Sequence, residues 1–252
     1  MYFKNEEYSL YYEKHGNSNK EILILPGWGD TRKTFNYLIN YFKEEYTLYI
    51  LDYPGFGNSS FPNRDLTIYD YTNIVRDFMK YENIKDPIII AHSFGGRIAS
   101  LLSGYYKEKI NKLILIDIAG IKPKKNIFKF LKTYTYKLLK KLSIIIPKRK
   151  RNIYLKRLFR FFASTDYKNL DNTMCQTFKN IVNEDLKFTY KNININTLLI
   201  WGENDKSTPL KDGIYMNKNI INSNLVIYPD SGHFSYLDYP NLTNKIIEEF
   251  LK

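Results

Sequence analysis

The sequence predicts an α/β fold in which a mostly parallel central sheet is flanked by helices and carries a helical cap insertion. Short, continuously apolar runs alternate with segments of helical periodicity, a pattern typical of parallel strands that helices cover on both faces. Only residues 121–191 break the alternation. A chain of 252 residues can form one large core. We therefore expect residues 1–120 and 192–252 to form that core and 121–191 to form a basic helical cap.

The N-terminal elements follow from turn and capping signals beside the apolar runs. The first strong strand ends at the turn-forming sequence PGWG, and the short polar residues after it are good helix caps. The sequence DYPGFGNS at 52–59 is expected to be mainly a structural turn. The expected elements are an edge strand at 8–13, a strand at 21–25, a helix from Asp30 or Thr31 to about Phe42, and a strand at 46–51.

The later elements repeat the same alternation. After Thr67, apolar side chains recur at helical spacing, which predicts an amphipathic helix. The run PIIIAH that follows it is apolar almost throughout, as expected of a strand buried on both faces. The expected elements are the helix from Thr67, strands at 87–92, 113–116, 197–200 and 225–228, and a final helix at 240–251.

The net charge of +12 comes from one segment. Residues 122–160 hold 15 Lys or Arg and no Asp or Glu, which leaves 23 basic and 26 acidic residues elsewhere. No zinc-finger, RNP or helix-turn-helix signature accompanies this charge, so we expect no nucleic-acid partner. The N-terminus lacks a secretory signal pattern, and the longest purely apolar run, at 144–146, is far below the roughly 20 residues that cross a bilayer. We expect a cytoplasmic protein.

Residues 89–98, IIAHSFGGRI, end an apolar strand directly in a serine and then begin a helix. A tight strand-to-helix turn holds such a serine in a sparsely populated conformation and tolerates only small neighbours two positions away, as Ala91 and Gly95 are. The turn also places the Ser93 hydroxyl above a helix N-terminus, where free backbone N–H groups favour the oxyanion of acyl transfer. The pattern predicts that Ser93 is a nucleophile.

This pattern resembles the nucleophile elbow of the α/β-hydrolase superfamily, and the chain is identified as a serine esterase-like member with an inserted helical cap. The family's oxyanion loop matches residues 25–29, LPGWG. The resemblance implies that the backbone N–H groups of Trp28 and Phe94 hold the oxyanion. Two departures, Pro26 for the usual His and Ala91 for the usual Gly, remove no backbone N–H that the site needs. No metal and no organic cofactor is implied.

The resemblance also implies where the acid lies. Residues 202–205 read Gly-x-x-Asp after a late strand, as in the family, which makes Asp205 the expected acid. Asp117, Glu203 and Asp230 are the alternatives, since Asp117 ends a strand where some members carry the acid. We expect Asp117 and Asp230 to be solvated or turn-forming and Glu203 to point away from the imidazole.

His233 follows the last expected strand and completes the order Ser, Asp, His that this fold uses. His15 lies near the N-terminal edge, and His92 is expected to point the wrong way from a buried strand, so neither is the expected base. His233 would take the Ser93 proton, while Asp205 would orient the imidazole and stabilise the imidazolium.

The expected function is hydrolysis of a carboxylic ester or related acyl bond, through an acyl-enzyme, with a small apolar acyl substrate. The fold leaves thioesterase, lactonase, carbon–carbon hydrolase and aminopeptidase activities open, and also a non-catalytic ligand-binding or receptor role. An amphipathic helix at 126–146 is expected to cover the site as a lid. Its lysines could instead give the basic cap a peripheral contact with an anionic membrane or an anionic substrate.

Overall fold

The structure of the chain is a computed structural model that describes residues 1–123, 135, 139–143, 146–162 and 172–252. The strands are β1 (Tyr2–Lys4), β2 (Ser9–His15), β3 (Glu21–Leu25), β4 (Thr47–Leu51), β5 (Ile88–His92), β6 (Lys112–Ile116), β7 (Thr197–Gly202) and β8 (Ser223–Tyr228). The helices are η1 (Arg32–Phe35), α1 (Asn36–Phe42), α2 (Ile68–Tyr81), α3 (Phe94–Gly104), α5 (Lys148–Phe162), α6 (Asn172–Asn183), α7 (Lys187–Tyr190), α8 (Leu210–Asn219), α9 (Ser235–Asp238) and α10 (Pro240–Leu251).

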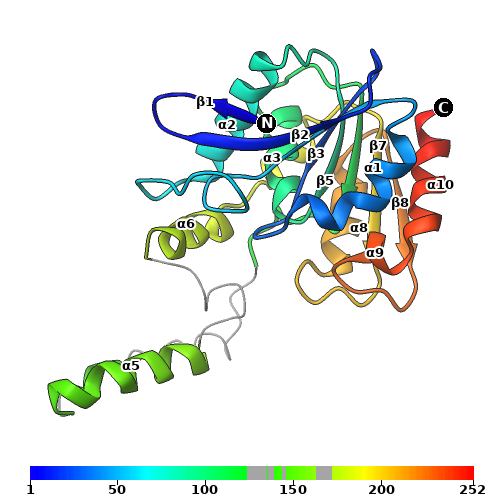
Figure 1. Cartoon of the computed structure of the whole chain (residues 1–252). Coiled ribbons are helices and arrows are strands. Elements are labelled where there is room, and N and C mark those ends of the chain that lie inside the picture. Colours follow the sequence, from blue (N-terminus) through cyan, green and yellow to red (C-terminus); the bar gives the residue numbers. More distant parts are fainter. Residues whose placement is uncertain (124–134, 136–138, 144–145, 163–171) are drawn as a thin grey trace.

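Within these residues the strands form one sheet in the order β1-β2-β4-β3-β5-β6-β7-β8 (Figure 1). The pairings of β2 with β1 and with β4 are antiparallel, and all the others are parallel. This mostly parallel sheet, flanked by helices, confirms the predicted fold class.

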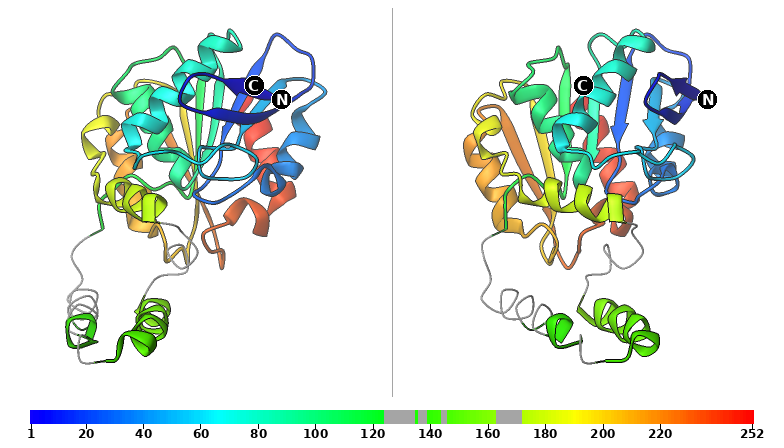
Figure 2. Two further views of the ribbon diagram at one scale, coloured as in Figure 1. Left: turned by 60° about the vertical axis from the view of Figure 1, so that its left-hand side comes forward. Right: turned by 90° about the vertical axis from the view of Figure 1, so that its left-hand side faces the viewer.

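The side chains of β3 show how the sheet is covered on both faces. Ile22 and Ile24 pack in a core cluster with residues of α1 and α10, whereas Leu23 and Leu25 pack with residues of α2, α3 and α8. Successive side chains of a strand point to opposite faces, so a strand covered twice needs a continuous apolar run. Figure 2 shows the two helical layers on either side of the sheet.

Parallel pairing brings the carboxyl ends of β5, β7 and β8 to the same edge of the sheet. These strands end at His92, Gly202 and Tyr228, and β5 and β7 are both neighbours of β6. In open α/β sheets ligands bind outside the carboxyl ends of the strands. The loops that carry the three expected catalytic residues therefore start at the edge where a binding site is expected.

Two local expectations differ from the structure. The run at 8–13 was expected to be an edge strand and forms most of β2, but β1 pairs with β2 and is the edge strand instead. Phe3 of β1 lies opposite Leu10 of β2, and both side chains are buried. The helix expected from Asp30 or Thr31 starts as the 3-10 turn η1 and becomes α-helical at Asn36. The Thr31 side chain makes no capping hydrogen bond, so the regular helix begins later than the sequence suggests.

Between β6 and β7 the described part of the chain contains α5, α6 and α7. In Figures 1 and 2, α6 lies beside the sheet and α5 lies away from it. Most of the cap helix expected at 126–146 lies outside the described residues, so its lid role stays a prediction, as do the domain boundaries. Among the residues that are described, no helix is long and apolar enough to cross a membrane.

Candidate active site

Ser93 occupies the turn between β5 and α3 in a strained backbone conformation. Its φ of 47° and ψ of −111° lie where residues with a Cβ are rarely found, at a cost of about 1–3 kcal/mol. The Ser93 carbonyl accepts hydrogen bonds from Gly96 N–H at 3.1 Å and Ala119 N–H at 2.9 Å, and the Ser93 N–H donates to the Ile116 carbonyl at 3.2 Å. These bonds fix the turn against α3 and the end of β6.

Close packing explains the two glycines that follow the serine. A Cβ on Gly95 would lie 2.0 Å from the Leu25 carbonyl oxygen, and a Cβ on Gly96 would lie 2.2 Å from Ile118 Cβ. Because neither residue carries a side chain, helix α3 can start directly against the end of β3 at Gly95 and against Ile118, just after β6, at Gly96. The small residues of the elbow are therefore a packing requirement of the turn that holds Ser93.

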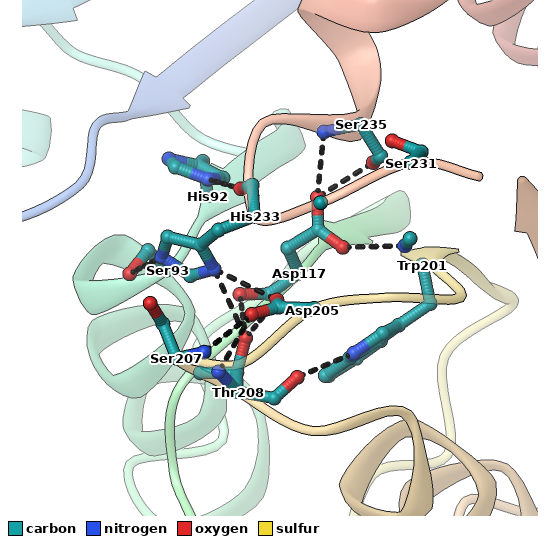
Figure 3. Close-up of polar contacts among 12 residues, drawn as sticks. His92, Ser93, Asp117, Trp201, Asp205, Ser207, Thr208, Ser231, His233 and Ser235 are labelled. Atoms are coloured by element: carbon teal, nitrogen blue, oxygen red, sulfur yellow. Dashed lines mark hydrogen bonds and ion pairs between the residues drawn. The ribbon is translucent and has the colours of Figure 1, made fainter.

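The structure brings Ser93, His233 and Asp205 together, and Figure 3 shows them joined by hydrogen bonds. His233 Nε2 lies 2.9 Å from Ser93 Oγ, and His233 Nδ1 lies 2.8 Å from Asp205 Oδ2. Because an ionised carboxylate can only accept, Nδ1–H donates to Asp205, which leaves Nε2 as the acceptor for the Ser93 hydroxyl. This arrangement can activate a serine by general-base catalysis.

Hydrogen bonds hold Asp205 in its ionised form. Asp205 Oδ1 accepts from the N–H groups of Ser207 at 2.7 Å and Thr208 at 2.9 Å, and the Thr208 hydroxyl lies 2.6 Å from Oδ2. Burial alone would raise the pKa of Asp205, but the hydrogen bonds from His233 and Thr208 outweigh burial and lower the pKa below 3.8. Thr208 was not among the expected site residues, although a hydroxyl residue three positions after an Asp is typical of such a local turn.

The two backbone donors expected for the oxyanion lie next to the serine. A Cβ on Gly27 would lie 3.5 Å from Ser93 Cβ, so the loop that carries Trp28 packs against the elbow. Phe94 is the first residue of α3, and neither its N–H nor the Trp28 N–H has an acceptor among the described residues. Free N–H groups beside a nucleophile can stabilise the negative charge that develops on a carbonyl oxygen.

The expectation that Asp117 is a solvated or turn-forming carboxylate is wrong, because its side chain is fully buried. Asp117 Oδ1 accepts from Gly202 N–H at 2.8 Å, and Oδ2 accepts from Ser235 N–H at 3.0 Å and from the Ser235 hydroxyl at 2.6 Å. Burial raises the pKa of Asp117 to about 6. The carboxylate thus connects the loop of Asp205 to the loop of His233, through Gly202 and Ser235 rather than through the imidazole.

Other polar residues near the expected acid have structural roles or face solvent. Glu203 and Asp230 are both exposed, and Glu203 Oε2 lies 3.4 Å from the Asp230 N–H nitrogen. In the loop at 52–59, Asp52 Oδ2 accepts from Asn58 N–H at 2.9 Å, which agrees with the expected structural turn.

His92 contacts the loop of the expected base, which the sequence did not indicate. The ring is buried, and its Nε2–H donates to the carbonyl oxygen of His233 at 2.8 Å (Figure 3). Burial, aided by the neighbouring His233, lowers the pKa of His92 to about 3, so the ring is neutral. His92 therefore positions the backbone of His233.

A cavity of about 980 Å³ is lined by Ser93 and His233. Helix α6 supplies part of its wall, so the described part of the segment between β6 and β7 contributes to the site. The Trp28 ring lies between α3 and α6 in this wall. Its centroid is 5.4 Å from that of Phe94 on α3 and 5.2 Å from that of Phe178 on α6. The larger apolar side chains of the lining include Trp28, Phe94, Ile121, Phe178, Ile181, Val182 and Phe234.

Comparison with known protein families matches residues 20–240 to the family described as the alpha/beta hydrolase fold. A similar curated protein is the pimeloyl-[acyl-carrier protein] methyl ester esterase of Wigglesworthia glossinidia brevipalpis. The two sequences are 30% identical over 257 residues, a match that covers 94% of this chain and 95% of that protein.

Solved structures show the same fold. A hydrolase from Pseudomonas aeruginosa has a TM-score of 0.78 at 17% identity, and the match covers 100% of this chain and 97% of that one. The enol-lactonase from Burkholderia xenovorans has a TM-score of 0.76 at 19% identity, covering 100% and 99% of the two chains. At these identities the likeness concerns the fold alone.

Proposed function

The chain belongs to the alpha/beta hydrolase family, and on this premise we propose that it is an esterase that hydrolyses a carboxylic ester through an acyl-enzyme on Ser93. The observation that carries the proposal is the hydrogen-bonded series from Ser93 through His233 to Asp205 beside a cavity whose wall includes several apolar side chains. The curated relative named as a methyl ester esterase supports an ester as the bond that is cleaved.

In the proposed acylation, Ser93 Oγ attacks the ester carbonyl carbon while its proton passes to His233 Nε2. Asp205 stabilises the resulting imidazolium, and the N–H groups of Trp28 and Phe94 bind the oxyanion. The tetrahedral intermediate then expels the alcohol, which takes its proton from His233. Water attacks the acyl-enzyme with His233 again as the base, and the carboxylic acid leaves as Ser93 regains its proton.

The proposed substrate has a small or medium acyl group with an apolar chain, because aromatic and aliphatic side chains line the cavity. Thioesters and lactones present the same kind of carbonyl and are the alternatives within this mechanism. A purely ligand-binding role would not require a general base aligned with a strained serine. Contact of the basic segment 122–160 with an anionic membrane or anionic substrate stays a prediction, as does a cytoplasmic location.

A substrate panel tests the proposed function. The purified protein is assayed with 4-nitrophenyl and methyl esters of short, medium and long acids, and with thioesters, lactones and aminoacyl amides. We expect the highest kcat/KM for esters, because the cavity provides an apolar wall and the serine is activated. A clear preference for aminoacyl amides, or tight binding without any turnover, would contradict the proposal.

A further inference from the structure

Arg97 is a buried cation in the wall of the cavity that contains Ser93. It lies on α3, about one turn after the serine, and only 3% of its surface is exposed. Its Nη1–H donates to the Glu184 carbonyl oxygen at 3.0 Å. Among the described residues no carboxylate forms an ion pair with it, and a guanidinium has five N–H donors to satisfy.

The two acidic residues whose charges act on Arg97, Glu184 and Asp185, each have another partner. Glu184 Oε1 accepts from the Tyr69 hydroxyl at 3.1 Å, and Asp185 Oδ2 lies 3.5 Å from Lys187 Nζ. Burial lowers the pKa of Arg97, and the neighbours that raise it, first Tyr190 and then Asp185 and Glu184, do not offset that effect. Arginine nevertheless keeps its proton in proteins, and a buried charge without a counter-ion is costly. An anion in the cavity would remove that cost.

Positive charge exceeds negative charge around the same cavity. The basic residues of its described wall are Arg97, Lys122, Lys187, Lys206 and Lys211, and the acidic ones are Asp30 and Asp212. Asp30 already accepts from the Thr31 N–H at 2.8 Å and from the Thr34 hydroxyl at 3.0 Å. An excess of one sign of charge in a cleft with low-dielectric walls attracts ligands of the opposite sign.

We infer that the substrate carries a carboxylate which Arg97 binds while Ser93 attacks an ester elsewhere on the same molecule. This inference rests on the proposed esterase function and narrows it to monoesters of dicarboxylic acids. A planar guanidinium pairs with a carboxylate through two parallel N–H···O bonds. The apolar wall, including Phe178 and Ile181, would cover the methylene groups between the two ends. Since Arg97 and Ser93 are fixed to the same helix start, their separation selects the chain length.

Matched esters of one carbon skeleton test the inference. Monomethyl and dimethyl esters of succinate, glutarate, adipate and suberate differ in one charge, and methanol release gives kcat/KM for each. At the best chain length the wild-type protein should prefer the monomethyl ester. Arg97→Gln should lower the ratio of monoester to diester kcat/KM about 30-fold, as expected for a charged hydrogen bond. Arg97→Lys keeps the charge but not the planar guanidinium, so it should lower this ratio less than Arg97→Gln does.

The control variant is Lys218→Gln, since Lys218 is exposed on α8 and is not part of the cavity wall. It removes one positive charge and should leave the ratio unchanged. Equal ratios in wild type and Arg97→Gln, or a wild-type preference for the diester at every chain length, would overturn the inference. If Arg97→Gln does not fold, calorimetry measures the binding of monomethyl and dimethyl adipate to the Ser93→Ala protein. Tighter binding of the monoester supports the anion site, and equal binding of the two esters overturns it.

The diester separates this inference from the proposed function. Hydrolysis of diesters and monoesters without a charge preference would leave the esterase function standing and remove the role of Arg97. If the wild-type protein binds the monoester selectively but hydrolyses no ester, the result supports the anion site and contradicts the esterase function.

Discussion

Ser93→Ala is expected to lower kcat for ester hydrolysis about 10⁶-fold, the effect of removing the nucleophile in one serine protease. The hydrogen bonds that fix the elbow use the Ser93 backbone, which alanine retains, so only the oxygen facing His233 is lost. We therefore expect the variant to fold with a melting temperature close to that of the wild type. Turnover of a 4-nitrophenyl ester and thermal unfolding measure the two effects separately.

Ser103→Ala is the matched control for this prediction. Ser103 lies on the same helix, where its hydroxyl donates to the Ala99 carbonyl at 2.7 Å, and it is not part of the cavity wall. Its loss should leave kcat unchanged. A folded Ser93→Ala protein with a rate within about tenfold of wild type, a difference of only ~1.4 kcal/mol in barrier, would show that Ser93 is not the nucleophile.

Asp205→Asn is expected to lower kcat by about 10⁴-fold, the effect of the same change in another Ser-His-Asp enzyme. An amide nitrogen in place of Oδ2 would donate to His233 Nδ1 and stabilise the tautomer whose Nε2 carries the proton. That tautomer cannot accept the Ser93 proton, so kcat should fall while KM changes little. Steady-state kinetics of one ester with both proteins checks this split.

Asp117→Asn distinguishes the acid from the carboxylate behind it. Gly202 donates to Oδ1 of Asp117 and Ser235 donates to Oδ2, and in asparagine an NH2 group that cannot accept replaces one of these oxygens. We expect the substitution to reduce the free energy of unfolding by about 1–3 kcal/mol, with a smaller effect on kcat than Asp205→Asn has. A nearly silent Asp205→Asn beside a strongly inactive, stably folded Asp117→Asn would assign the acid to Asp117 instead.

The sheet could be predicted from the sequence because its signals are local. Each central strand is a short apolar run, and helix α2 begins at Ile68, directly after its N-cap Thr67, which forms a capping box with Asp70. The elbow was also predictable, since the collisions that Gly95 and Gly96 avoid are set by one turn. The edge strand β1 was not predicted, because only its pairing with β2 identifies these three residues as a strand.

The contacts around the site could not be predicted, because they join residues far apart in the chain. Asp117 meets the Gly202 N–H across 85 positions, and the His92 ring meets the His233 carbonyl across 141. A carboxylate at the end of a strand can face water, or loops from distant parts of the chain can bury it. The neighbouring sequence looks the same in both cases. The same is true of Arg97, whose burial depends on the loop that contains Glu184.

Covalent labelling with an alkyl fluorophosphonate, followed by peptide mass spectrometry, tests the central claim most directly. The reagent phosphonylates a serine only where a base activates it and donors stabilise the tetrahedral adduct. We expect one phosphonyl group per chain, on the peptide that contains Ser93, slower labelling in Asp205→Asn, and none in Ser93→Ala. Labelling of a different residue, or hydrolysis of esters by a protein whose Ser93 stays unlabelled, would contradict an acyl-enzyme at Ser93.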